Sequence, residues 1–199
     1  MQLTENMVAI SFNTSLQKYG GDMAVASMSI LNSIMQFVML LLPGLVQGAQ
    51  PLLSYNLGAQ NISRVKKTFR LLLACCVSGS FFIWLICMTV PAAVTSIFTS
   101  DIALIIYTNK SMRVYLAMLF IYGIQVACQY SFVALDQAPK AIFLTIWRKI
   151  IILIPLIFIL PHFMPHAVMG VYLAEPIADT IAVCTTAPMF YFYYRKLKD

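Results

Sequence analysis

Residues 71–100 read LLLACCVSGSFFIWLICMTVPAAVTSIFTS and contain no Asp, Glu, Lys or Arg. Three further stretches share this property, at residues 23–63, 114–135 and 150–174. An α-helix needs about 20 apolar residues to cross the hydrocarbon core of a bilayer. The four stretches therefore predict helices that span a membrane.

The composition argues against a water-soluble domain. Of the 199 residues, 61% are hydrophobic and 10% are charged, whereas soluble domains carry about 25% charged residues. Membrane-spanning β-strands alternate apolar and polar residues, and the run LLLACCV at residues 71–77 does not alternate. We expect an all-α integral membrane protein in contact with the lipid bilayer.

Several functional classes find no support in the sequence. Basic residues beside the ends of the apolar stretches account for the pI near 9.1, so no nucleic-acid partner is expected. The five cysteines lack disulfide or metal spacing. His162 and His166 have no third ligand nearby in sequence, so neither a metal site nor a cofactor is expected. Neither HExxH nor GxSxG occurs, and no enzyme is expected.

The apolar stretches divide the chain into six predicted spans. The first is incomplete and covers residues 3–18; the others cover 23–55, 65–98, 102–135, 138–163 and 167–194. Six helices without a soluble domain suit one lobe of a two-lobed transporter, because many transporters are built from repeated bundles. We therefore assign residues 1–199 to a single transmembrane lobe, the six-helix bundle of a twelve-helix transporter.

Basic residues are distributed unevenly between the loops. One side of the predicted bundle has three, Lys18, Lys110 and Arg113. The other side has ten: Arg64, Lys66, Lys67, Arg70, Lys140, Arg148, Lys149, Arg195, Lys196 and Lys198. Cytoplasmic loops carry an excess of Lys and Arg. The loop near residue 64 and the C-terminus are therefore expected in the cytoplasm.

Polar residues follow one face of the second predicted span. They recur in steps of three and four, with Leu40 as the one interruption: Ser29, Ser33, Gln36, Pro43, Gln47, Gln50 and Ser54. Inside a membrane such residues face other helices or water. Packing between helices would explain the small residues, but three glutamines favour a lined cavity. Gln36, Gln47 and Gln50 are thus candidate substrate-binding residues.

The fourth predicted span carries a second stripe, of aromatic, thioether and amide side chains. It consists of Tyr115, Met118, Tyr122, Gln125, Gln129, Phe132 and Asp136. Aromatic faces and methionines suit flat or cationic ligands of varied shape, although aromatic stripes also occur in ordinary helix packing. Tyr122, Gln125 and Gln129 are the candidate substrate-binding residues here.

Two carboxylates lie four residues apart in the last predicted span. Glu175 is about 12 Å along the helix from Ala167, and Asp179 is about 6 Å deeper. A carboxylate at the bilayer centre costs about 2.5–3.5 kcal/mol on insertion scales, so it faces the bundle or a wet cavity. Their mutual repulsion suits proton binding and release. The alternative is a structural pair with a basic partner such as Arg148.

Arg148 and Lys149 allow two interpretations. They could be anchors whose charged groups reach the cytoplasmic interface, or they could line the mouth of a cavity.

Several stretches together resemble the C-terminal lobe of multidrug and toxic compound extrusion (MATE) transporters, over essentially the whole chain. They are YGGDMA at 19–24, QGAQPLLSYNLGA at 47–59, IFTSD at 97–101, IPL at 154–156 and GVYLAEPIAD at 170–179. The second stretch is the most specific. The sequence is most similar to the bacterial drug-efflux branch of that family.

The resemblance implies an exporter of two six-helix lobes in the plasma (inner) membrane. Such an exporter exchanges drug-like organic cations for H⁺ or Na⁺. This chain would supply helices seven to twelve and would need an N-terminal lobe as partner. Some members carry one acidic residue in helix seven and another in helix ten. Glu5 falls near the first position, which makes it a third candidate for cation coupling; Tyr122 stands at the second.

Three functions remain open from the sequence. The leading one is a cation-coupled antiporter for drug-like organic cations, present here as one lobe. The second is a non-transporting fragment or a membrane scaffold subunit. The third is a flippase for lipid-linked saccharides, whose cavity should hold more cationic residues.

The charge distribution leads to a prediction of topology. Cysteines introduced near Arg64, Lys140 and Lys198 should react from the cytoplasm, and cysteines at Gly20 and His162 should react from outside. Intact cells treated with a membrane-impermeant thiol reagent provide the measurement. Labelling of residue 64 from outside would reverse the proposed orientation.

Overall fold

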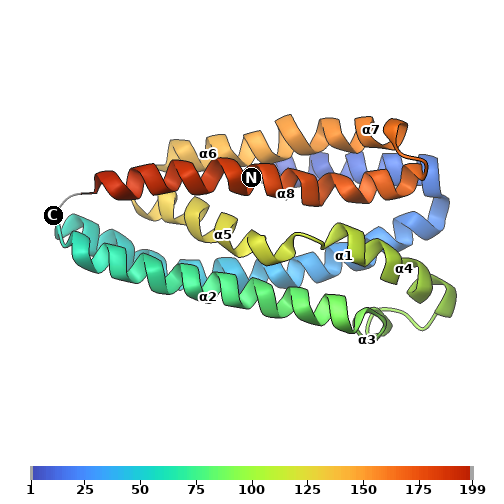
Figure 1. Ribbon diagram of the computed structural model, residues 1–199, viewed down its shortest axis with the longest axis horizontal. Coiled ribbons are helices and arrows are strands. Elements are labelled where there is room, and N and C mark those ends of the chain that lie inside the picture. Colours follow the sequence, from blue (N-terminus) through green and yellow to red (C-terminus); the bar gives the residue numbers. More distant parts are fainter. Residues whose placement is uncertain (1, 198–199) are drawn as a thin grey trace.

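The structure is a computed structural model that describes residues 2–197, with side chains from residue 4 onward. Lys198, assigned above to the cytoplasmic side, lies outside these residues. Within the described part of the chain, every regular element is a helix, and the helices run along a common axis in an elongated bundle (Figure 1). The predicted all-α fold is thereby confirmed.

The first helix, α1 (Gln2–Gly58), is broken at Gly21. Gly21 has φ 62° and ψ −159°, a backbone conformation that glycine adopts without steric cost. The chain turns back here, so that the two arms of α1 run in opposite directions (Figure 1). Gln17 donates a hydrogen bond across the break to Asp22 at 3.0 Å, and the buried Tyr172 hydroxyl donates to the Ala24 carbonyl at 2.9 Å.

The span predicted at residues 65–98 is not one continuous helix. It consists of α2 (Ile62–Thr89) and a short α3 (Pro91–Ser96). Proline lacks an N–H group and disfavours a helical residue before it. Val90 accordingly leaves the helical region, with φ −127° and ψ 52°, and Pro91 starts the next helix.

The span predicted at residues 102–135 is broken as well. Its parts are α4 (Ile102–Tyr115) and α5 (Leu119–Ala134), bent by 52°. Helix α2 satisfies the backbone at this break: Trp84 Nε1 donates to the Ala117 carbonyl and Ser80 Oγ to the Phe120 carbonyl, each at 3.1 Å. Irregular backbone at membrane depth requires such partners, because lipid offers none.

The last two predicted spans form an antiparallel pair. The first consists of α6 (Ala138–Ile146), the π-helix η1 (Trp147–Leu153) and α7 (Ile154–Phe163), and the second is α8 (Ala167–Lys196). The turn between α7 and α8 lies at the same end of the bundle as α3 and the turn within α1 (Figure 1). The α1–α2 turn and the C-terminal end of α8 lie at the opposite end (Figure 1).

Helix length and hydropathy support a multi-pass membrane protein. Within the described residues, four helical segments are long and apolar enough to cross a membrane, and the bent α4–α5 pair makes up to five. One of the four is α1, counted once although its arms run in opposite directions.

A close approach between α2 and α5 generates a prediction about stability. A β-carbon at Gly123 would overlap the Cys76 carbonyl oxygen and would lie 2.5 Å from Ser80 Oγ. Overpacking of this kind costs about 1–3 kcal/mol, so Gly123→Ala should lower the thermal unfolding temperature of the purified protein. Gly44→Ala is the matched control, because a β-carbon there meets no atom within 4 Å. Equal unfolding temperatures for the two variants would contradict the close packing.

Candidate functional site

A cavity of about 560 Å³ lies between the two arms of α1 and the helices α4, α5, η1 and α8. Its wall is largely aromatic, thioether and amide, with charged groups on one side. The lining includes Glu5, Asn6, Phe12, Met28, Asn32, Gln36, Met39, Gln47, Tyr115, Tyr130, Arg148, Lys149 and Glu175. The cavity therefore combines surfaces suited to an apolar ligand with buried charge.

Arg148 holds both carboxylates of α8. Its Nη2 donates to Glu175 Oε1 at 2.7 Å, and its Nε donates to Asp179 Oδ1 at 2.8 Å. The three residues have exposed fractions of 4%, 7% and 5%. The Arg148 Cζ atom also lies 5.3 Å from the centroid of the Tyr122 ring. The planar guanidinium fork suits this arrangement because it can donate to two carboxylates at once.

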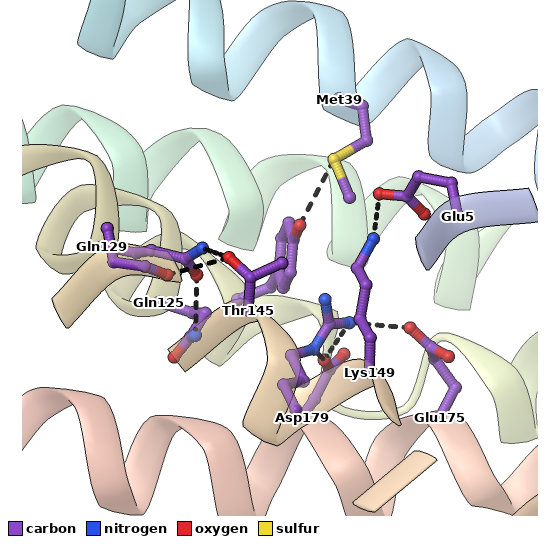
Figure 2. A network of polar contacts seen from close by, with 11 residues as sticks. Glu5, Met39, Gln125, Gln129, Thr145, Lys149, Glu175 and Asp179 are labelled. Carbon is purple, nitrogen blue, oxygen red and sulfur yellow. Dashed lines mark hydrogen bonds and ion pairs between the residues drawn. The ribbon is translucent and has the colours of Figure 1, made fainter. Parts of the chain in front are cut away.

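A second ion pair joins Lys149 of η1 to Glu5 of α1. The Lys149 side chain is 10% exposed and that of Glu5 is 56% exposed, so this pair lies toward the opening of the cavity. Figure 2 shows Glu5, Lys149, Glu175 and Asp179 converging on one region from three elements.

The π-helix explains how two consecutive basic residues enter the same cluster. Side chains of neighbouring residues in an α-helix point about 100° apart, and the wider π-helical turn changes that direction locally. Arg148 is ten residues beyond Ala138, or about 15 Å along the segment, which places it near mid-span. Single π-turns often occur at functional sites.

The charged cluster has one excess negative charge. Three carboxylates face two basic groups when all five are ionised. No other Asp, Glu, Lys or Arg among the described residues lines the cavity or the side pocket next to it. Burial of ions is costly unless they are paired, so the unbalanced carboxylate favours a cationic occupant.

A small side pocket of about 40 Å³ adjoins the large cavity. The two share Glu5, Met39, Tyr130, Arg148 and Lys149 in their linings. The side pocket is further lined by Tyr122, Val126, Gln125, Gln129 and Thr145. The candidate residues of the fourth predicted span thus lie together, beside the charged cluster.

Only part of the polar stripe on the second predicted span lines the cavity. Gln36 and Gln47 line the cavity, whereas Gln50 is absent from the described lining. Ser29 and Ser33 donate to carbonyls of their own helix, and Ser54 donates to the Ala134 carbonyl at 2.8 Å. These serines serve the backbone rather than the cavity.

Comparison with known proteins places the chain in a family. The MatE family model matches residues 1–159. The chain belongs to the MatE family. The resemblance seen in the sequence is thereby confirmed.

Curated relatives of this MatE chain include two proteins named multidrug export protein MepA. The protein from Staphylococcus haemolyticus is 27% identical over 197 residues, which are 97% of this chain and 41% of the relative. The protein from Staphylococcus aureus shows the same identity and coverage. The chain thus spans about two fifths of the length of these relatives.

Solved MATE structures share the fold. An outward-facing multidrug resistance transporter of the family superposes with a TM-score of 0.91 at 16% identity, covering 100% of this chain and 44% of that one. An inward-facing structure gives a TM-score of 0.90 at 16% identity, with 98% and 45% covered. The described helices form one lobe of this architecture.

Two interpretations of Arg148 and Lys149 can now be separated in this MatE chain. Anchoring at the interface is wrong, because both side chains are buried beside the cavity. They also carry no information on topology, which leaves eight basic residues on the expected cytoplasmic side against three. The structural alternative for Glu175 and Asp179 correctly named their partner, Arg148.

The Arg148 bridge leads to a prediction about stability and pH. Arg148→Met should destabilise the protein, because loss of one partner from a buried ion pair costs about 3–5 kcal/mol. The loss of stability caused by Arg148→Met should be smaller at low pH, because protonated carboxylates carry no charge and are no longer stabilised by the guanidinium charge. Thermal unfolding across a pH series is the measurement, with Arg113→Met, at an exposed arginine, as the control. A loss of stability that does not change with pH would argue against ionised carboxylates in this bridge.

Proposed function

We propose that this chain forms one lobe of a cation-coupled antiporter that exports drug-like organic cations. The coupling ion is H⁺ or Na⁺. The proposal places the lobe in the plasma (inner) membrane with its C-terminus in the cytoplasm. An N-terminal lobe is the proposed partner, and the transport path lies between the two lobes.

The excess negative charge of the cluster is the observation that carries this proposal. Glu175 and Asp179 share one guanidinium, so they retain one uncompensated charge. A carboxylate in the membrane interior is costly unless it finds a counter-charge or water. A proton, a sodium ion or an organic cation would each supply the missing positive charge.

The cavity wall supports an organic cation as the substrate. Phe12, Tyr115 and Tyr130 provide aromatic faces, which attract cations. Met28 and Met39 are unbranched and flexible, so they can adapt to ligands of different shape. Gln36 and Gln47 add groups that can donate or accept hydrogen bonds at the periphery.

Exchange follows if the two cations compete for one charge. Binding of the coupling ion near Glu175 or Asp179 would weaken binding of the drug, and binding of the drug would weaken that of the ion equally. The break at Gly21 and the π-helix η1 are positions where small backbone changes could accompany this exchange.

The other two functions are less well supported. A saccharide flippase would need mainly cationic residues for anionic lipid phosphates, whereas carboxylates outnumber basic groups in the described cluster. A scaffold subunit would not need a charged cavity. Stability alone would not explain the buried ion pairs either, because such pairs often contribute little to it.

The coupling role of the carboxylates can be tested in the complete transporter. Asp179→Asn and Glu175→Gln each remove the excess charge, so pH-driven dye efflux from proteoliposomes should fall about tenfold or more. This estimate follows because hydrogen bonds to charged groups are worth roughly 1.5–3 kcal/mol. Asp136→Asn is the control, since Asp136 is exposed in a turn whose φ of 58° asparagine also adopts.

Parental rates and parental pH dependence in both carboxylate variants would show that the pair is structural. The coupling site would then lie elsewhere in the transporter.

A further inference from the structure

The side pocket contains a chain of hydrogen bonds that ends on the backbone. Gln125 Nε2 donates to Gln129 Oε1 at 3.1 Å, and Gln129 Nε2 donates to Thr145 Oγ1 at 2.6 Å. Thr145 Oγ1 in turn donates to the Ala141 carbonyl at 2.9 Å. Figure 2 shows Gln125, Gln129 and Thr145 arranged in this order beside the charged cluster.

The backbone fixes the direction of this chain. A hydroxyl group has one proton, and Thr145 gives its proton to Ala141, whose carbonyl can only accept. Thr145 must therefore accept from Gln129, which turns the Gln129 amide nitrogen toward Thr145 and its oxygen toward Gln125. Gln125 must then present its own amide nitrogen to Gln129. The Gln125 carbonyl oxygen is left pointing away from the chain.

The Gln125 carbonyl oxygen is buried and can still accept a hydrogen bond. Gln125 has an exposed fraction of 2%, and its Oε1 atom accepts no hydrogen bond from any of the described residues. The neighbouring Tyr122 hydroxyl donates its hydrogen bond to Met39 Sδ, 3.3 Å away. Gln125 and Tyr122 therefore both present oxygen acceptors, and buried acceptors without a donor are unfavourable.

The size and charge of the pocket define what can approach Gln125. About 40 Å³ exceeds the roughly 10–15 Å³ that a single water requires, so an N–H or O–H group fits. The nearby cations are already paired, Arg148 with the carboxylates of α8 and Lys149 with Glu5.

We propose that this pocket is a subsite for a hydrogen-bond donor, namely the N–H of a protonated amine on the transported cation. Gln125 is its specificity-determining residue, and Thr145 is a positioning residue that fixes the orientation of the Gln125 amide. The inference rests on the proposed function and narrows the substrate class. Protonated amines are favoured over quaternary ammonium ions, which have the same charge but no N–H.

Two probes that differ in a single methyl group test the subsite. One is a dansyl amide with a dimethylaminopropyl chain, which is protonated at neutral pH; the other is its quaternary N-methyl derivative. Binding to the complete transporter, with its N-terminal lobe, in lipid nanodiscs is followed by dansyl fluorescence. The parent should bind the protonated amine about tenfold more tightly, the ratio that one buried hydrogen bond of about 1.4 kcal/mol supplies.

Variants distinguish a change in the orientation of the Gln125 amide from a general loss of structure. Thr145→Val removes the acceptor for Gln129 and frees the amides to rotate, so the Kd ratio should fall close to one. Thr145→Ser keeps the hydroxyl and should keep the preference. Gln125→Leu should also abolish the preference, chiefly by weakening the protonated probe. Thr185→Val is the control, because Thr185 likewise donates to the carbonyl four residues earlier but lies outside both described pocket linings.

The outcomes distinguish this inference from the proposed function. A parental Kd ratio in folded Thr145→Val, or equal binding of both probes by the parent, would overturn the donor subsite and leave organic-cation binding intact. Failure of the parent to bind either probe would contradict both proposals.

Discussion

The contact of one guanidinium with two carboxylates is the constraint around which this lobe is organised. Arg148, Glu175 and Asp179 lie where an unpaired charge would be costly, so each needs the others in a defined geometry. The π-helix η1 and the inward face of α8 satisfy that geometry. The first arm of α1 places Glu5 opposite Lys149, so the described cluster holds three carboxylates and two basic groups.

Irregular backbone in the bundle occurs where other groups can compensate for it. The bend between α4 and α5 receives hydrogen bonds from Trp84 and Ser80 of α2. Tyr172 of α8 bonds the α1 backbone three residues after Gly21. A neighbouring helix therefore bonds the backbone at or near both of these breaks, and helices that are separate in sequence are coupled through these contacts. Lipid could not replace them, because it offers no hydrogen-bond partner.

The sequence predicted those features that depend on local composition. Charge-free stretches identified the membrane helices, and the spacing of Glu175 and Asp179 placed both on one face. The glycines at 20–21 lie between the first two predicted spans and allow the turn seen there, whereas the stop before Pro91 was signalled by proline but missed. No proline or glycine occurs at residues 116–118, so the bend between α4 and α5 had no local signal. The choice of Arg148 as the shared partner depends on contacts 27 and 31 residues apart. The π-helix could have been suspected only from two adjacent charges within an apolar helix.

The two tryptophans of the chain lie at two of the irregular segments, the α4–α5 bend and the π-helix η1. Trp84 donates its indole N–H to the Ala117 carbonyl at the α4–α5 bend. Trp147 directly precedes Arg148 and stacks on Phe143, with 6.2 Å between the ring centroids. Indole emission responds to hydrogen bonding and to nearby charge. The molecule thus contains two native optical probes, one at the bend and one at the charged cluster. Replacing either with phenylalanine isolates the signal of the other, so backbone motion and charge rearrangement can be followed separately without an added dye.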